Sequence, residues 1–255
     1  MTDPQRLRRV GHKGAALIAP GNTFASFDAA ATAGVDMIEF DVLPEPGTGR
    51  LVLAHDYPDA AGRVPHSLEE GLAYLAADRF AGVEFDVDLK GPGYELAVIG
   101  ALRAQGLLER TLISTQYRAS LALIRARDPA VRLGWSVPKL KRDPFRSPAS
   151  AMLAGAGLPL LRAVLPGLAA AAIRAGRCDA LMAQWRLVTP RLVRSVRGAG
   201  GELYVWTVDE LPRMQMLDTL GVTGVITNDP RLFTALVHAS TDRATARAAA
   251  LAPMI

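Results

Sequence analysis

Short apolar or β-branched runs alternate with longer Ala-, Leu- and Arg-rich segments along the whole chain. The short runs have the length of strands, and the longer segments repeat apolar residues with the period of a helix. Alternation of this kind favours a parallel sheet built from strand–helix units. We predict eight principal strands, the second with a hairpin-like extension, at Arg9–His12, Asp36–Leu43 (extension Arg50–His55), Gly82–Lys90, Thr111–Thr115, Arg132–Ser136, Asp179–Ala183, Glu202–Thr207 and Gly224–Thr227.

A helix is predicted after each of these strands. The helices fall near Thr23–Ala33, Ser67–Ala77, Tyr94–Gln105, Tyr117–Arg127, Ala149–Ala175, Pro190–Ala199, Glu210–Leu220 and Pro230–His238. Eight strands with eight helices predict an α/β fold, the closed (β/α)8 or TIM barrel. A doubly wound open sheet is the alternative, but no G-x-G-x-x-G motif follows the first strand.

Three helix starts carry residues typical of N-caps. These are Asn22 before Thr23, Ser67 with Glu70 three residues later, and Asp209 before Glu210. All three support the predicted helix boundaries and say nothing about chemistry.

The most apolar stretch, Ala149–Ala175, is interrupted by Pro159, Arg162 and Pro166. We therefore predict helical segments around a turn, packed in the outer layer, and no transmembrane segment. An approach of this stretch to a lipid surface, or its use in a dimer interface, stays open, and so does the oligomeric state.

Length and composition favour a single domain that spans residues 1–255, because 255 residues that are 50% apolar suit one large core. We place this core at about 8–238 and expect no sizeable insertion domain. The single cysteine, Cys178, excludes an intrachain disulfide and a Cys-based metal site. No apolar run of signal-peptide type follows the Arg-rich first ten residues, so we expect a cytoplasmic protein.

Net charge is +4, from 29 Lys and Arg against 25 Asp and Glu. The arginines are spread along the sequence without a dense basic and aromatic cluster, which argues against nucleic acid as a partner.

Polar side chains gather where the first strands end. His12 ends the first strand, Glu39 and Asp41 alternate along the second, and His55 ends its extension. On the third strand the same alternation turns Glu84, Asp86, Asp88 and Lys90 inward. Active sites of barrels of this kind lie at the carboxyl ends of the strands, so we expect these groups to share one site.

Several carboxylates in a partly dry barrel mouth repel one another unless a cation balances them. Because all the candidate ligands are oxygens, the pattern predicts one divalent cation, Mg²⁺ or Ca²⁺. A metal, lysines and two histidines together suit phosphoryl transfer, with His12 and His55 exchanging protons. The roles of Glu84 and Asp86 stay open between further metal ligands and partners in salt bridges.

The chain resembles the glycerophosphodiester phosphodiesterase family, among the phospholipase-C-like phosphodiesterase barrels. The resemblance rests on G-H-K-G at 11–14, P-G-N-T at 20–23, A-G-V-D-M-I-E-F-D-V at 33–42, L-A-H-D at 53–56, D-L-K at 88–90, Y-V-W-T-V at 204–208 and G-V-I-T-N-D-P at 224–230. It implies catalysis by His12 and His55, a metal on Glu39, Asp41 and Asp88, substrate or phosphate contacts by Lys13, Lys90 and Trp206, and release of sn-glycerol 3-phosphate from a glycerophosphodiester through a cyclic phosphate.

The sequence departs from the family pattern at three positions. Lys13 stands where the family usually has Arg, Gly21 where it has Glu, and Asp88 where it has Glu. The Asp-x-Lys on the third strand is also similar to that of sphingomyelinase-D-like phospholipases, so a phospholipase-D-like enzyme acting on lysophospholipids or choline lipids is an alternative. A non-catalytic barrel that binds phosphorylated ligands through Lys13 and Lys90 is another.

Overall fold

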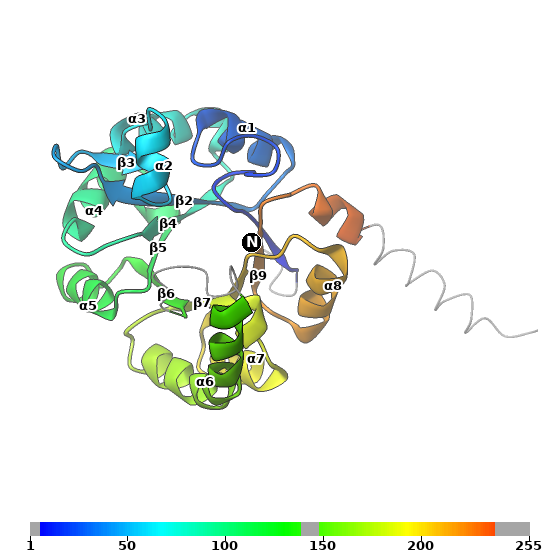
Figure 1. Ribbon diagram of the computed structural model, residues 1–255. Coiled ribbons are helices and arrows are strands. Elements are labelled where there is room, and N and C mark those ends of the chain that lie inside the picture. Colours follow the sequence, from blue (N-terminus) through cyan, green and yellow to red (C-terminus); the bar gives the residue numbers. More distant parts are fainter. Residues whose placement is uncertain (1–5, 139–147, 238–255) are drawn as a thin grey trace, which may run out of the picture.

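The computed structural model describes residues 6–138 and 148–237, and its centre is a closed barrel of eight parallel strands (Figure 1). The ring is closed because β1 pairs with β9 on one side and with β2 on the other. The strands are β1 Arg8–Gly11, β2 Met37–Pro44, β4 Glu84–Leu89, β5 Thr111–Thr115, β6 Arg132–Val137, β7 Ala180–Gln184, β8 Glu202–Trp206 and β9 Gly224–Thr227. A ninth strand, β3 (Leu51–Leu53), pairs antiparallel with the end of β2 outside the ring.

Helices surround the barrel (Figure 1). They are α1 Phe24–Thr32, α2 Tyr57–Gly62, α3 Leu68–Leu75, α4 Glu95–Ala104, α5 Arg118–Arg127, α6 Pro148–Arg174, α7 Pro190–Arg197 and α8 Leu211–Leu220, with a further helical stretch at 232–237 and the 3-10 turns η1 Asp78–Phe80, η2 Leu108–Arg110 and η4 Trp185–Leu187. The predicted TIM barrel is confirmed.

Two of the predicted helix caps are wrong. Thr23, not Asn22, caps α1 and forms a capping box with Ser26, while Glu210 is the N-cap residue of α8 and makes no side-chain capping hydrogen bond. The Ser67–Glu70 capping box of α3 is confirmed. Asn22 and Asp209 are therefore free to make the contacts in the site described below.

Side-chain alternation along the strands separates two cores, as expected for a barrel. Outward residues such as Phe40, Phe85 and Val87 pack against the helices. Inward residues such as Met37, Leu112 and Tyr204 fill the barrel itself.

The predicted turn inside the longest helix is wrong. α6 is continuous, and both Pro159 and Pro166 lie inside it. Within the described residues, one window of this helix, Gly157–Arg174, is long and apolar enough to cross a membrane by length and composition, although a third of it is buried against the rest of the chain. Because Leu165 and Ala169 are buried in the outer core, the helix covers the barrel.

An ion-pair network closes the amino end of the barrel. Glu84 binds Arg8 and Arg132 at 2.6 and 2.7 Å, and Arg132 also binds Glu202 at 3.0 Å. Burial alone would raise the pKa of Glu84, but the hydrogen bonds from the two arginines outweigh it and lower that pKa. Glu84 is thus a salt-bridge partner and does not line the site.

Replacing Arg132 with methionine is expected to lower the free energy of unfolding by about 1–3 kcal/mol. The loss is smaller than for a fully buried pair because these side chains keep some contact with water. Since the pKa of Glu84 is depressed in the folded state, its contribution is fully present above its unfolded pKa, begins to fall below that value and is lost as pH falls through its folded pKa. Urea unfolding at pH 7 and pH 4 should show a smaller difference between variant and wild type at pH 4.

Candidate active site

A cavity of about 1360 Å³ opens at the carboxyl ends of the strands. The structure brings seven of the eight predicted site residues to its wall, namely His12, Lys13, Glu39, His55, Asp88, Lys90 and Trp206. The eighth, Asp41, is fully buried and contacts the site through Lys90.

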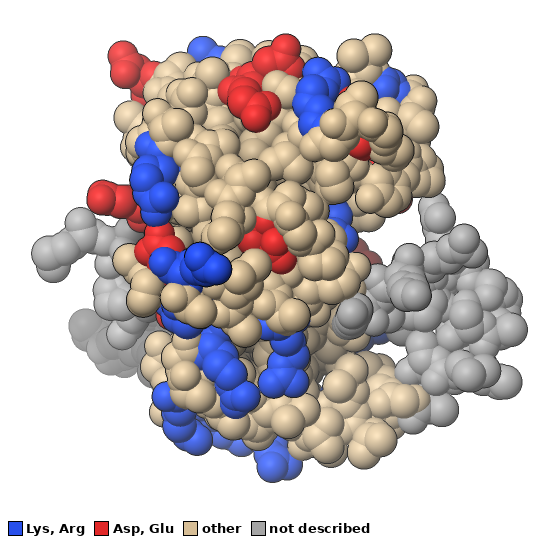
Figure 2. All heavy atoms as spheres, turned by 90° about the vertical axis from the view of Figure 1, so that its left-hand side faces the viewer, with Lys and Arg blue, Asp and Glu red and all other residues tan. Residues whose placement is uncertain are grey.

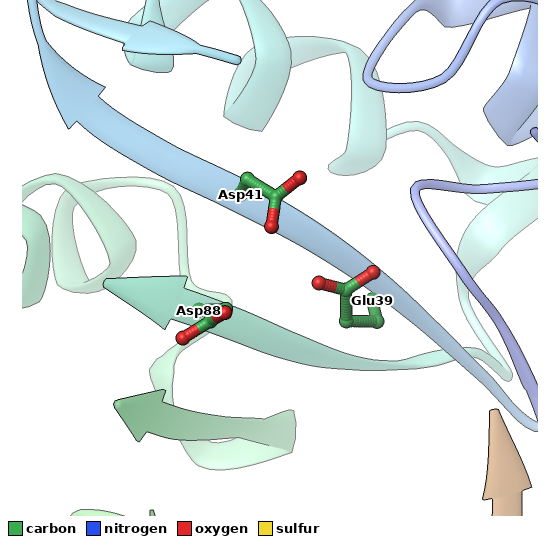
Figure 3. A group of neighbouring side chains, drawn as sticks. All are labelled: Glu39, Asp41 and Asp88. Carbon is green, nitrogen blue, oxygen red and sulfur yellow. The ribbon is translucent and has the colours of Figure 1, made fainter. Parts of the chain in front are cut away.

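Three carboxylates converge beside this cavity. Glu39 and Asp41 project from β2 and Asp88 from the neighbouring strand β4, with their carboxylate groups turned toward a common space (Figure 3). One oxygen atom of each lies within 4.8 Å of one from each of the others. The convergence follows from strand register, because Asp41 is directly opposite Asp88 in the β2–β4 pairing.

A fourth carboxylate lies at the level of Glu39, deeper in the barrel than Asp41 and Asp88. Asp86 is opposite Glu39 in the same pairing, is 1% exposed and lines the cavity. Its Oδ1 atom is buried without a hydrogen-bond partner. Burial raises the pKa of Asp86 to about 8.

Lys90 is the cation that contacts the cluster directly. Its Nζ atom lies 2.5 Å from Asp41 Oδ1 and 2.6 Å from Asp88 Oδ2. Burial would lower the pKa of Lys90, but the charges of Asp41 and Asp88 raise it well above its usual value. The same lysine, against the effect of burial, holds the pKa of Asp41 low.

One lysine does not balance four acids. Burial and the charge of Asp41 raise the pKa of Glu39 well above normal, and burial also raises that of Asp88. An all-oxygen set of this kind is what Mg²⁺ and Ca²⁺ bind, and a bound divalent cation would relieve the repulsion. Glu39, Asp41 and Asp88 therefore fit a divalent metal.

Asn22 fixes the orientation of Asp41. Its Nδ2 donates to Asp41 Oδ2 at 2.8 Å, and its Oδ1 accepts from the Asp41 backbone N–H at 3.0 Å. Asn22 is fully buried and has a left-handed backbone (φ 58°), a conformation that Asn tolerates better than most residues. Interpreting Asn22 as a helix cap did not predict this contact with Asp41.

His12 is held by a chain of hydrogen bonds from Asp209. The Asp209 carboxylate accepts from Asn228 Nδ2 at 2.7 Å and from the Asn228 backbone N–H at 2.8 Å. Since a carboxylate only accepts, the Asn228 amide must turn its Oδ1 away, and that oxygen lies 2.6 Å from His12 Nδ1. His12 Nδ1 therefore carries the proton and donates it, which leaves Nε2 as an acceptor.

His12 has a lowered pKa, which keeps its ring neutral and able to accept a proton as a base. Burial, helped by the positive charge of Lys13, lowers its pKa to about 4. The ring is thus neutral at physiological pH. Its Nε2 atom lies 3.9 Å from Glu39 Oε2, so the free acceptor faces the carboxylate cluster.

His55 also lines the cavity and is more open to solvent, with 46% of its side chain exposed. Its backbone N–H donates to Asp59 of α2, and Arg63 binds both Asp59 and the carbonyl of Leu53. The short helix α2 thereby fixes the segment that carries His55. Asp56 as N-cap and a proline in the first turn are the signals that could have predicted this helix.

The cavity wall also has aromatic and apolar side chains. It includes Tyr117, Leu158, Leu161, Trp185 and Trp206. The indole N–H of Trp206 donates to the Met182 carbonyl at 3.0 Å, which fixes that ring.

Comparison with known sequences identifies a family that matches most of the chain. The profile of the Glycerophosphoryl diester phosphodiesterase family matches residues 12–67 and 110–232. The matched ranges include both histidines, Glu39 and Asp41, but not Asp88 or Lys90. A glycerophosphodiester phosphodiesterase of Caldanaerobacter subterraneus is 26% identical over 261 residues, covering 90% of this chain and 97% of the relative.

Solved structures with the same fold are also found. A glycerophosphodiester phosphodiesterase from Parabacteroides distasonis superposes with a TM-score of 0.70 at 15% identity, covering 92% of this chain and 98% of that one. An Oleispira antarctica phosphodiesterase in complex with the product sn-glycerol-3-phosphate gives a TM-score of 0.66 at 18% identity, covering 91% and 97%. At these sequence identities the similarity to the solved structures shows a shared fold and nothing further.

Proposed function

Because the chain belongs to the glycerophosphoryl diester phosphodiesterase family, we propose that it hydrolyses glycerophosphodiesters to sn-glycerol 3-phosphate and an alcohol, with one divalent metal and the pair His12 and His55. One observation carries the proposal: the clustered carboxylates of Glu39, Asp41 and Asp88 share a cavity with both histidines. The product named in the Oleispira antarctica complex supports the choice of substrate.

The metal would be held by Glu39, Asp41 and Asp88. When bound, it supplies positive charge that stabilises the negative charge developing on the phosphoryl oxygens. Lys13 and Lys90 add positive charge at the same wall. Trp206, held by its bond to Met182, offers a flat apolar surface for the glycerol carbons.

His12 acts as the base in the first step. Its free Nε2 removes the proton from the 2-hydroxyl of the glycerol, whose oxygen forms a new bond to phosphorus. As the bond from phosphorus to the leaving alcohol breaks, His55 gives its proton to that alcohol's oxygen. The enzyme is left with a protonated His12, a neutral His55 and a cyclic phosphate.

The second step restores both histidines. His55 now takes a proton from water, whose oxygen attacks phosphorus, and His12 returns its proton to the 2-oxygen as the ring opens. The roles fit the environments, since the buried His12 starts neutral and the more exposed His55 is open to the water that attacks in this step.

The cavity gives a second candidate, a phospholipase-D-like activity on lysophospholipids. Its volume exceeds the range of about 300–1000 Å³ usual for small-ligand sites. Leu158, Leu161 and Trp185 would accept an acyl chain. Release of glycerol 3-phosphate from water-soluble glycerophosphodiesters, compared with release of the headgroup alcohol from lysophospholipids, decides between the two.

Replacing Asn228 with leucine is expected to lower kcat by about ten- to hundredfold with little change in KM. The variant removes the acceptor that keeps the proton on His12 Nδ1, and with it part of the roughly 10²–10⁴-fold contribution of a positioned acid–base group. Asn228→Asp should act differently. Its carboxylate would raise the pKa of His12, so kcat/KM would fall off at a higher pH on the acidic side than in wild type. Parallel pH profiles would refute the role of Asn228.

A further inference from the structure

Charge is distributed unevenly between the two sides of the barrel. Residues 148–201, which form α6, β7, η4 and α7, contain seven arginines and a single acid, Asp179. That acid is paired with Arg125 at 2.6 Å. In Figure 2 the lower part of the surface, on the side of α5 to α7, shows Lys and Arg without Asp or Glu.

The outer face of α6 is apolar. Leu160, Val164 and Leu168 repeat every four residues and are 69%, 42% and 52% exposed. Residues four apart lie on one face of a helix, so the three form a continuous stripe. The opposite face of α6 buries Leu165 and Ala169 in the outer core.

The stripe begins at the mouth of the active-site cavity and is flanked there by arginines. Leu158 and Leu161, next to Leu160, line the cavity. Arg162 donates to the Arg186 carbonyl at 2.7 Å. Arg186 and Arg213 both lie over the ring of Trp185, at 4.2 and 3.5 Å from its centroid.

We propose that this α6 patch, made of Leu160, Val164 and Leu168 with Arg162 and Arg186, binds the surface of an anionic phospholipid bilayer. Apolar side chains beside cations match such a surface, because the arginines pair with lipid phosphates while the leucines enter the acyl boundary. The helix lies on the bilayer without crossing it, since its inner face covers the barrel. The cavity mouth then opens at the lipid surface.

A lipid surface accounts for the patch better than a nucleic acid does. Single-stranded nucleic acid binds to basic grooves in which exposed aromatic rings stack on bases. Here the exposed apolar groups are aliphatic, and Trp185 is already covered by two guanidinium groups.

The test is sedimentation of the full-length protein with vesicles of phosphatidylcholine alone or mixed with phosphatidylglycerol. We expect binding to the anionic vesicles only, weakened as salt rises from about 0.1 to about 0.5 M. Leu160→Ser with Leu168→Ser, and separately Arg162→Glu, should each lower the apparent affinity at least about tenfold. Leu96→Ser and Arg103→Glu are matched controls on α4, where both side chains are also exposed.

Hydrolysis of a water-soluble glycerophosphodiester serves as an independent readout, because neither the α6 variants nor the α4 controls change a residue that lines the cavity. All should keep wild-type activity in solution. No binding to anionic vesicles, equal binding by the α6 variants and wild type, or a salt-sensitive affinity for single-stranded RNA without vesicle binding would each overturn the proposal. Loss of vesicle binding in the α4 controls would do so as well.

Discussion

Replacing His12 with alanine is expected to lower kcat for glycerophosphodiesters by about 10²–10⁴-fold, the usual contribution of a positioned acid–base group. The variant removes the neutral acceptor that Asn228 and Asp209 hold toward the carboxylate cluster. His55→Ala should lower kcat by a similar factor on substrates whose leaving group is an alkyl alcohol. The fold should survive both changes, since His12 lies at a cavity wall and His55 is half exposed.

The roles of the two histidines can be distinguished with a substrate whose leaving group needs no proton. With the glycerol phosphodiester of p-nitrophenol, whose anion leaves without a proton, His55→Ala should release the first equivalent of p-nitrophenol at close to the wild-type rate, measured in a single turnover because ring opening still needs His55. His12→Ala should stay slow, because the attacking 2-hydroxyl still needs a base. Equal losses in both variants on this substrate would show that the assigned roles of acid and base are wrong.

Sequence alternation predicted the architecture and the carboxylate cluster. The period of two along β2 and β4 turns Glu39, Asp41 and Asp88 inward wherever the exact strand ends fall, so errors of one residue in the boundaries had no effect. The same alternation left the role of Glu84 undecided. Alternation predicts which face of the strand a side chain occupies, but not how far along the barrel axis it lies. Glu84 starts β4 and meets arginines at the amino end.

Local rules failed where polar residues have long-range partners. Asn22 and Asp209 stand before helices and read as caps, yet they bind Asp41 and Asn228 across the fold. Only the closure of the ring brings the end of β9 beside the end of β1, and with it Asn228 beside His12. Likewise, residues 148–201 contain a single acid in the sequence, but only the packing of α6 against α7 places their arginines on one side of the barrel.

Removal of divalent cations with a chelator is expected to abolish hydrolysis, and addition of Mg²⁺ or Ca²⁺ to restore it. Asp41→Asn should lose activity at all but very high metal concentrations, because the neutral amide takes one charge from the ligand set and disturbs the contacts with Asn22 and Lys90. Asp28→Asn, at an exposed carboxylate paired with Arg79, is the matched control.

Metal binding can be separated from catalysis by thermal unfolding. A cation that binds only the folded chain at about a hundred times its Kd stabilises it by about 2.7 kcal/mol. For a domain of this size that corresponds to a rise in Tm of about 5–10 °C. Wild type, His12→Ala and Asp28→Asn should all show the rise, whereas Asp41→Asn should not, because it lacks one of the three carboxylates that would hold the cation. A full rise in Asp41→Asn would place the metal elsewhere and leave the carboxylate cluster neutralised by Lys90 and by protons.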